Sequence, residues 1–576
     1  MFRFFKWFFK TILTTLLRLI VLILFLFIIA TVFINKNQPD PEIYDNSLLK
    51  LSFPIVVNDF GTDDVKNLAE LSLSPIMYRD YLNAINHSRF DSKIKGLYIN
   101  LDAIHGLGKE QMEELILTIV DFKKSGKKVY AYGEYITSSG YEIAVVADSI
   151  LMPGSTSAML NLTGFSKSFI YYKDLLEKFG VKTNVIHAGD FKSYGENYSK
   201  SKMSEQFKSE INKIYDERFK LFIEVLSRRF SDSSTLEKDI LSGKFAMLTP
   251  SEAKEFGLID EITTPTALIE EKKLNKFSSI SDYARSYMFE KKFNSVDLKD
   301  EIAILYAEGN IVSSFDRTED CINPTKLVPI IKELREDDNV KAVILRVNSG
   351  GGSALSSELI YQELKKLADK KELVVSMGNI AASGGYYIST PAKTIYAGKN
   401  TITGSIGVVA MLPQFSKTAE MLGLNIETVN LGKFGSLYSP LTGFEEGAEK
   451  LFMDRLFKTY DEFKSRVMDN RNISPDSIES IAGGRIWTGT QAVNIGLVDK
   501  IGYLNDIVDD LKKEYGDLKV TTYPKPLSLL DRISSRFDKF PLSMFGDEVK
   551  TISKKFRTFK SLSGEILFHT MIEDLK

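Results

Sequence analysis

Gly378-Asn379-Ile380-Ala381-Ala382-Ser383-Gly384-Gly385-Tyr386-Tyr387 is the most informative stretch of this sequence. It follows an apolar run, residues 373–377, that predicts a buried strand and places Ser383 at the end of that strand. Two glycines after a serine leave its backbone amide uncrowded and let a helix begin close under the hydroxyl, as an attacking serine requires. Ser383 is therefore a candidate nucleophile, with a structural turn as the alternative interpretation.

A glycine-rich loop lies upstream of this serine. Residues 343–347 predict a second buried strand, which ends in Asn348-Ser349-Gly350-Gly351-Gly352-Ser353. Consecutive glycines expose consecutive backbone N–H groups, and an acyl-transfer serine needs such donors for its tetrahedral oxyanion. We therefore predict Gly351 and Gly384 as the oxyanion donors. The alternative is a flexible turn between a strand and a helix.

The composition limits the classes of protein to which the chain can belong. With 576 residues it is too long for one core, so two or more domains are expected. Lys and Arg total 74 against 76 for Asp and Glu, and the basic residues are scattered, which argues against a nucleic-acid partner. The single cysteine, Cys321, excludes an internal disulfide.

The N-terminus predicts a membrane anchor. Residues 11–34 are predominantly apolar and long enough to cross a bilayer core of about 30 Å. No small-residue cleavage site follows them, so an uncleaved transmembrane helix is favoured over a signal peptide. Arg3, Lys6 and Lys10 precede this stretch, and Arg18 lies within it, where its side chain can snorkel toward the basic side. The positive-inside rule then keeps the N-terminus in the cytoplasm and sends the rest of the chain across the membrane.

The remainder of the chain is a repeated α/β unit. Short apolar strands alternate with longer amphipathic patterns, which favours an α/β fold. The two copies align at a constant offset of 245 residues around the serine stretch, where Gly133, Ser138, Gly140 and Tyr141 match Gly378, Ser383, Gly385 and Tyr386. We therefore predict a membrane anchor in residues 1–40, a first half in 41–285, a second half in 286–520 and a C-terminal tail in 521–576.

The first copy has lost its glycine loop. It has Ile104-His105-Gly106 where the second copy has three glycines, and Ser138-Ser139 where the second has Ser383-Gly384. Ser138 is therefore predicted to be a vestige of a nucleophile. At a second position it is the second copy that lacks a functional side chain: Lys192 of the first copy aligns with Gly435 of the second. This complementarity predicts a split active site, with a lysine from one half and a serine from the other.

The choice of general base follows from these differences. None of the four histidines, His87, His105, His187 and His569, lies in a motif with an orienting carboxylate, although His187 is near Lys192 in sequence and remains the alternative. A lysine can act as a base once burial lowers its pKa. Ser405, in a turn between Gly404 and Gly407, is predicted to accept a hydrogen bond from neutral Lys192 and orient it, or else to be only a turn residue.

These motifs together resemble the signal peptide peptidase (protease IV) family in its long, duplicated form. The matching stretches are Arg346-Val347-Asn348-Ser349 with its glycines, Ala381 to Tyr386, Ile402 to Gly407, and Trp487-Thr488-Gly489. The resemblance implies tandem crotonase/ClpP-like domains and a Ser–Lys dyad. Ser383 would be the nucleophile, Lys192 the general base, Ser405 its hydroxyl partner, and Gly351 and Gly384 the oxyanion donors. The family usually has proline where this chain has Gly350, a change that loosens the loop but removes no donor.

The same resemblance implies the biological setting. It predicts a homotetramer on the extracytoplasmic side of a bacterial cytoplasmic membrane, acting on cleaved signal peptides and other extended hydrophobic segments without metal or cofactor. Two alternatives remain, a catalytically inactive membrane scaffold that binds apolar segments and a crotonase-like acyl-CoA enzyme. The second would need paired glutamates near Gly351 or Ser383, which the sequence lacks there. The tail could pack on the second half, on another subunit or on the membrane, and packing on the second half is the favoured prediction.

Overall fold

The computed structural model describes residues 43–53, 59–60, 76–104, 106–294, 298–316, 318, 321–525 and 566–568. The expected anchor in residues 1–40 lies outside these ranges, as do His105, His569 and most of the tail. Among the helices of the described ranges, none has the length and apolar character needed to span a membrane.

A six-stranded parallel sheet forms the centre of the first half. In spatial order its strands are β8-β5-β3-β2-β1-β9. Their bounds are β1 Ser47–Leu51, β2 Ile94–Asn100, β3 Lys128–Tyr132, β5 Ser149–Met152, β8 Glu261–Ile262 and β9 Phe277–Ser279. The strands are short apolar runs that are buried almost throughout, because helices cover both faces of a parallel sheet.

The second half contains a larger sheet of eight strands. Its main path is β17-β15-β13-β11-β10-β19, and β14 and β18 continue from β13. Their bounds are β10 Glu301–Glu308, β11 Val340–Ser349, β13 Glu372–Ala382, β14 Thr394–Ala397, β15 Ile402–Gly404, β17 Ile486–Thr488, β18 Lys500–Ile501 and β19 Lys519–Tyr523. All neighbours are parallel except β15 and β17.

The two sheets share one strand order. The run β9-β1-β2-β3-β5-β8 in the first half corresponds to β19-β10-β11-β13-β14-β18 in the second. In the same way β4 (Tyr135–Thr137) and β6 (Met159–Asn161) of the first half correspond to the end of β13 and to β15. The prediction of an α/β protein is confirmed, whereas the domain boundaries at residues 285 and 520 stay a prediction.

Helices cover these sheets and give each half its own apolar core. In the first half they are α2 Tyr78–Ser88, α3 Lys109–Lys123, α4 Ser138–Ala144, α5 Lys173–Lys178, α6 Glu196–Ser199, α7 Glu205–Leu226, α8 Ser233–Leu241, α9 Pro250–Glu255, α10 Pro265–Glu271 and α11 Ile280–Asn294. In the second half they are α12 Pro324–Glu336, α13 Ala354–Ala368, α14 Gly384–Ser389, α15 Ser416–Met421, α16 Ala448–Arg471, α17 Pro475–Ile481, α18 Gly489–Asn494 and α19 Leu504–Tyr515.

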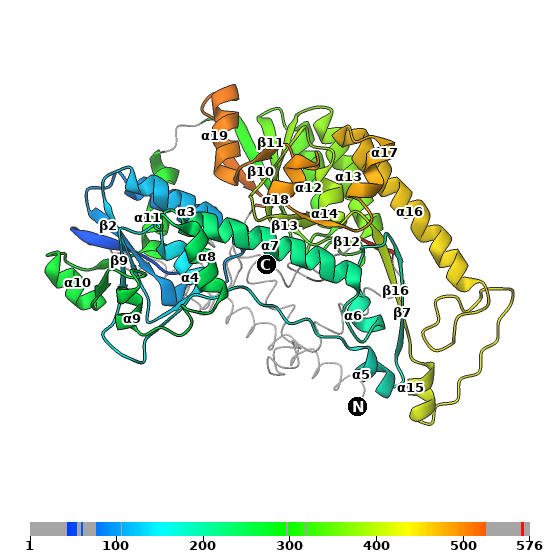
Figure 1. The fold of residues 1–576 in the computed structure, drawn as a ribbon. Helices are drawn as coiled ribbons and strands as arrows, with labels where there is room; N and C mark the ends of the chain where they lie inside the picture. The colour runs from blue at the N-terminus through cyan, green and yellow to red at the C-terminus, as the bar shows by residue number, and fades with distance from the viewer. Residues whose placement is uncertain are drawn as a thin grey trace, which may run out of the picture.

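The two halves lie side by side and are joined by a strand pair and a helix (Figure 1). β7 (Lys182–Ala188) of the first half pairs antiparallel with β16 (Val408–Gln414) of the second over seven residue pairs. Helix α7 reaches from one half to the other, and Phe207, Ile211 and Ile214 on it pack against apolar residues of β13, β15 and β17. We call this contact the seam. β20 (Ile566–Phe568) of the tail pairs antiparallel with β16 and with the short strand β12 (Gly352–Ser353).

Polar groups also tie the halves together. Arg346 on β11 is fully buried, and its guanidinium lies 2.7 Å from Asp59 and 3.0 Å from Glu110 of the first half. Asn379 on β13 accepts the backbone N–H of Glu110 at 3.0 Å, so it caps the first turn of α3. The strand that carries Ser383 is therefore anchored to the first half by hydrogen bonds as well as by apolar packing.

Candidate active site

Ser383 lies at the turn where β13 ends and α14 begins. Its backbone has φ 55° and ψ −117°, a conformation that costs a non-glycine residue about 1–3 kcal/mol. Its N–H donates to the carbonyl of Gly404 at 2.8 Å, which holds the turn against β15. The side chain is fully buried. The fold thus keeps this serine in a strained position that packing must support.

Lys192 reaches Ser383 from the other half of the chain. Its Nζ lies 2.6 Å from Ser383 Oγ, 2.8 Å from the carbonyl oxygen of Ser405 and 3.1 Å from Ser405 Oγ. A neutral amine has two N–H donors and one lone pair, so these three partners match its capacity. It can donate to both Ser405 oxygens and accept the Ser383 hydroxyl proton.

The surroundings of Lys192 favour this neutral form. The residue is 2% exposed, and burial lowers its pKa well below the ordinary value for lysine. Within the described residues no carboxylate forms an ion pair with Nζ that would restore the charge. Burial therefore favours the neutral amine, which is the form of lysine that can accept a proton.

The loop that carries Lys192 packs directly against Gly483 and Gly484 of the second half, and we call this pair of glycines the seat of the loop. The N–H of Phe191 donates to the carbonyl of Gly483 at 2.8 Å. Gly484 has φ 84°, and a Cβ built on it would stand 2.4 Å from the backbone nitrogen of Lys192. The guanidinium of Arg485 lies over the Phe191 ring, 3.5 Å from its centroid. The lysine can enter the site only because residue 484 has no side chain.

Ser405 is held as firmly as the lysine. It is 2% exposed, and its φ of 51° is again in the left-handed region. Its N–H donates to the carbonyl of Arg485 at 2.6 Å, so the turn after β15 is fixed to the segment that seats Lys192. Ser405 offers both its hydroxyl and its carbonyl oxygen to the amine. The structure thus brings Ser383, Lys192 and Ser405 into one cluster.

The two predicted oxyanion donors are neighbours. A Cβ built on Gly384 would lie 3.2 Å from the Cα of Gly351 and 2.7 Å from Ser357 Oγ. Gly351 has φ 104°, a conformation that strongly favours glycine. Its N–H donates to Ser349 Oγ at 3.2 Å. Gly384 directly follows Ser383, so the two glycines lie together beside that residue.

Asn348, on β11 close to these glycines, forms hydrogen bonds with the neighbouring strands β10 and β13. Its Oδ1 accepts the N–H of Ile380 at 3.3 Å, and its Nδ2 donates to Glu308 at 3.2 Å. The pairing of β11 with β13 changes register here, so the side chain of Asn348 takes the place of a ladder bond. Asn348 thereby fixes the distance between the glycine loop and the strand that carries Ser383.

Ser138 has none of this environment. Its Oγ donates to the carbonyl of Thr163 at 2.8 Å and accepts the N–H of Thr163 at 2.9 Å. Its hydroxyl is therefore used to hold a loop. Among the hydrogen bonds of the described residues, none joins it to a lysine or a histidine.

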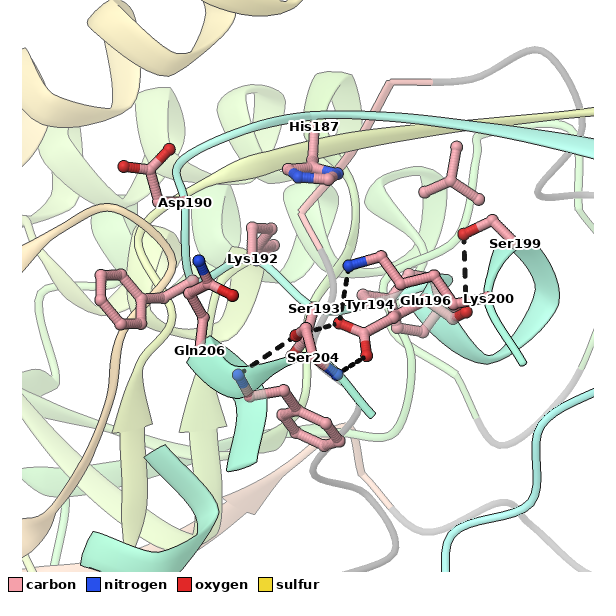
Figure 2. A pocket seen from close by; sticks show the side chains of 13 residues that line it. His187, Asp190, Lys192, Ser193, Tyr194, Glu196, Ser199, Lys200, Ser204 and Gln206 are labelled. Carbon is pink, nitrogen blue, oxygen red and sulfur yellow. Dashed lines mark hydrogen bonds and ion pairs between the residues drawn. The ribbon is translucent and has the colours of Figure 1, made fainter. Parts of the chain in front are cut away.

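His87 and His187 are the two histidines that the structure describes. His87 packs against the ring of Tyr287, with centroids 4.7 Å apart. His187 lies on β7 and lines a cavity of about 210 Å³ together with Asp190, Lys192 and Glu196 (Figure 2). Burial and the charge of Lys200 lower the pKa of His187. Ser383 does not line this cavity, and among the hydrogen bonds of the described residues none joins His187 to Ser383.

Sequence reasoning missed several residues that build the site. It did not find the seat at Gly483 and Gly484, the cap by Asn379, or the Asp59 and Glu110 partners of Arg346. The pair of glycines just before Trp487 is a signal that could have been noticed. The other contacts join residues far apart in sequence and leave no local signal.

Comparisons with known proteins find similar sequences over both halves of the chain. Peptidase family S49 matches residues 121–277 and again residues 365–517. The chain is 30% identical over 452 residues to Protease 4 of Haemophilus influenzae, covering 75% of this chain and 72% of that protein. It is 30% identical over 472 residues to the chloroplastic serine protease SPPA of Arabidopsis thaliana, covering 79% and 67%. A putative signal peptide peptidase SppA of Enterococcus faecium is 39% identical over 185 residues, covering 32% and 54%.

Proposed function

The chain belongs to peptidase family S49 and is a serine protease, and from this premise we propose that Ser383 is its nucleophile and Lys192 its general base. One observation carries the assignment. The Nζ of a fully buried lysine lies 2.6 Å from the hydroxyl of a strained, buried serine. Ser405 is proposed to orient the lysine, since it bonds Nζ through two oxygens.

Neutral Lys192 begins the reaction by taking the proton of Ser383. The serine oxygen then attacks the carbonyl carbon of the peptide and forms a tetrahedral intermediate. The lysine, now protonated, gives its proton to the leaving amine as the peptide bond breaks. Water activated by the same lysine then hydrolyses the acyl-enzyme and restores the serine.

Gly351 and Gly384 are proposed to bind the oxyanion. Preorganised amide donors in a dry site stabilise a developing negative charge, and losing one of them typically costs about 10²–10³ in kcat. The bond from the N–H of Gly351 to Ser349 Oγ is long at 3.2 Å. A charged oxygen is a stronger acceptor than a hydroxyl, so it can replace that bond.

The substrate is proposed to bind as an added strand. Between β12 and β16 the structure holds one strand, β20, antiparallel to both, with Phe568 opposite Gly352 and Leu567 opposite Val409. Gly352 directly follows the proposed oxyanion donor Gly351. An extended peptide in the same place would use main-chain hydrogen bonds for affinity and would bring its carbonyls toward Ser383. This geometry suits extended hydrophobic segments such as cleaved signal peptides.

The proposed setting is a bacterial cytoplasmic membrane. We place the N-terminal anchor across it, with the N-terminus in the cytoplasm and both halves on the extracytoplasmic side. The support is the apolar stretch in residues 11–34 with basic residues before it. We further propose a homo-oligomer, a tetramer by resemblance to the family. Two of the relatives are named Protease 4 and putative signal peptide peptidase SppA.

Peptidase activity of the full chain in detergent tests this proposal. The substrate is a fluorogenic hydrophobic peptide, and the variants are Ser383→Ala and Lys192→Ala. Both substitutions should abolish turnover while gel filtration and thermal melting stay normal. If Ser383→Ala keeps its peptidase activity, the nucleophile assignment is wrong. If the chain binds apolar peptides but even the native protein cleaves none, a scaffold role replaces this proposal.

A further inference from the structure

Helix α7, which reaches from the first half to the second (Figure 1), carries two glutamates that form ion pairs with the second half. Glu224, near its C-terminal end, lies 2.7 Å from Lys399, and both side chains are exposed. Glu210, near its N-terminal end, lies 3.3 Å from Arg485 and is only 2% exposed. A buried carboxylate is stable only when it is paired and hydrogen-bonded. The partners of Glu210 therefore matter more than those of Glu224.

The carboxylate of Glu210 holds both a side chain and the backbone of the second half. Its Oε1 accepts a hydrogen bond from Nη1 of Arg485 at 3.3 Å, and its Oε2 accepts the N–H of Ile486 at 3.3 Å. Lys213, one turn along α7, also donates to Oε1, at 2.9 Å, but its side chain is half exposed. Glu210 thereby fixes the segment at residues 485–486, which directly follows the seat.

Arg485 in turn contacts both of the turns that align the lysine. Its carbonyl oxygen accepts the N–H of Ser405 at 2.6 Å, so it holds the residue that bonds Nζ of Lys192. Its guanidinium lies 3.5 Å from the centroid of the Phe191 ring, and Phe191 directly precedes Lys192. A displacement of Arg485 would therefore move the amine and its partner together.

The guanidinium of Arg485 depends on Glu210 for its orientation. Among the ion pairs of the described residues, Arg485 forms this one alone. Its Nε is buried and has no hydrogen-bond partner within the same part of the chain. The contact with the face of the Phe191 ring attracts the cation but leaves it free to slide and rotate over the ring. Without the carboxylate, the side chain would keep its position only through that ring contact.

The first half lacks this arrangement around its own serine. In both halves the strand after the serine turn, β6 or β15, pairs antiparallel with the residues just before α9 or α18. Counting from this pairing, Leu162 takes the place of Ser405, and Ala246 takes the place of Arg485. The arginine is thus present beside the serine that bonds a lysine and absent beside Ser138, which bonds the backbone.

We propose that Glu210 is a positioning residue of the protease, which acts through Arg485 to align Ser405 and Lys192. Among the hydrogen bonds of the described residues, Glu210 has none to Lys192 or Ser383, so it acts only through the arginine. The first half would then supply the base and also the carboxylate that aligns it. This inference rests on the proposed roles of Lys192 and Ser405.

Loss of this carboxylate has two expected consequences for the reaction. A shift of Arg485 moves Nζ of Lys192 out of line with Ser383, which lowers kcat. The same shift uncovers the loop that carries the lysine and lets water reach the amine, which raises its pKa toward the ordinary value. The proposed substrate strand lies between β12 and β16, which Glu210 does not contact in the hydrogen bonds of the described residues, so KM should change little.

The first test is the pH profile of the full chain in detergent on a fluorogenic hydrophobic peptide. Glu210→Gln should lower kcat about tenfold, leave KM within about twofold and move the ascending limb to higher pH. Two controls should keep the native kcat and midpoint: Lys213→Met removes the other partner of the same carboxylate, and Glu224→Gln removes the other ion pair of α7. A native-like profile of Glu210→Gln overturns the proposal. A lower Tm with an unmoved midpoint does so too, because it shows a structural role alone.

The second test is a double-mutant cycle with Arg485→Met, a change at a side chain that is 23% exposed. If Glu210 acts through the arginine, adding Glu210→Gln to Arg485→Met should lower kcat no further. Losses that multiply would show independent roles and contradict the proposal. Ser383→Ala separates this inference from the proposed function. An active Ser383→Ala variant removes the dyad itself, whereas an inactive one beside a native-like Glu210→Gln overturns only the positioning role.

Discussion

The two halves share a strand order and a serine at the same place, yet their serines are held differently. Ser383 has a left-handed backbone, a buried hydroxyl and a lysine 2.6 Å away. Ser138 caps the loop at Thr163 with both its donor and its acceptor capacity. The two serines therefore differ in their hydrogen-bond partners, which are a lysine amine for Ser383 and the backbone of Thr163 for Ser138.

The contrast shows where catalytic potential resides in such a duplicated chain. The second half keeps the glycine loop and the strained turn, and the first half keeps the lysine. On the proposed assignment neither half holds a complete set, so the seam is part of the proposed site.

We expect the largest effect on activity when the side chains of the proposed nucleophile and base are removed. Ser383→Ala and Lys192→Met should each lower kcat/KM by about 10⁴-fold or more, because nucleophile and base act as a unit. Ser138→Ala should leave kcat/KM within about twofold of native. Steady-state kinetics on a fluorogenic hydrophobic peptide measures all three. Near-normal activity of Lys192→Met would move the base elsewhere, with His187 as the next candidate.

The seat of the lysine gives the next largest effect. Gly484→Ala would place a Cβ 2.4 Å from the backbone of Lys192 and push the amine out of line. We expect kcat to fall about 10²-fold, the usual cost of a misplacement near 1 Å. The matched control is Gly496→Ala, which has a similar φ of 79° but open space around its Cβ. An equal loss of kcat in both variants would mean that backbone strain, and not the seat, is responsible.

The pH profile tests the cause of the lysine's reactivity. Only the neutral amine can take the proton of Ser383, so kcat/KM should rise with pH as Lys192 loses its proton. Because burial lowers the pKa of Lys192, this rise should be complete well below pH 10. Ser405→Ala should move the midpoint of the rise and lower kcat about tenfold, since it removes one partner of Nζ. A profile without an ascending limb would contradict a lysine base.

The smallest expected effect concerns the buried carboxylates of α3. Burial raises the pKa of Glu114 to about 8, and its Oε1 is buried without a hydrogen-bond partner among the described residues. A pKa raised in the folded state gives stability that is present below the unfolded value near 4.5 and is lost as the pH rises through about 8. Thermal melts should therefore show a lower Tm at pH 9 than at pH 6. Glu114→Gln should flatten this dependence by a few degrees, and an unchanged slope would show that other groups cause it.

Much of the site could be predicted from the sequence, because alignment of the two copies showed the positions at which they differ. Ser383 and Lys192 meet in the structure, as the comparison of the two copies predicted. Ser405, predicted from its glycine-flanked turn, joins them, and the catalytic roles of all three stay predictions. The α/β class followed from short apolar runs alternating with amphipathic stretches. These signals are local or repeated, so one sequence suffices to find them.

The parts that could not be predicted depend on how the halves dock. Arg346 and Asp59 are in contact although they lie 287 positions apart in sequence, and the residues around each of them do not predict the pairing. The antiparallel pairing of β15 with β17 likewise follows from a return of the chain after α17. Such features depend on how the two halves dock, and local sequence propensity does not predict that docking.

The separation of Lys192 from Ser383 also has a consequence in time. They are 191 positions apart, and Gly484, which seats the lysine, comes later still. A ribosome that adds about 5–20 residues per second needs about 10–40 seconds to synthesise that interval. Throughout this time the emerging chain has a lysine without its dry pocket and, on the proposed assignment, no means of cutting a peptide. On that assignment, division of the site between two halves delays proteolysis until both halves have been synthesised.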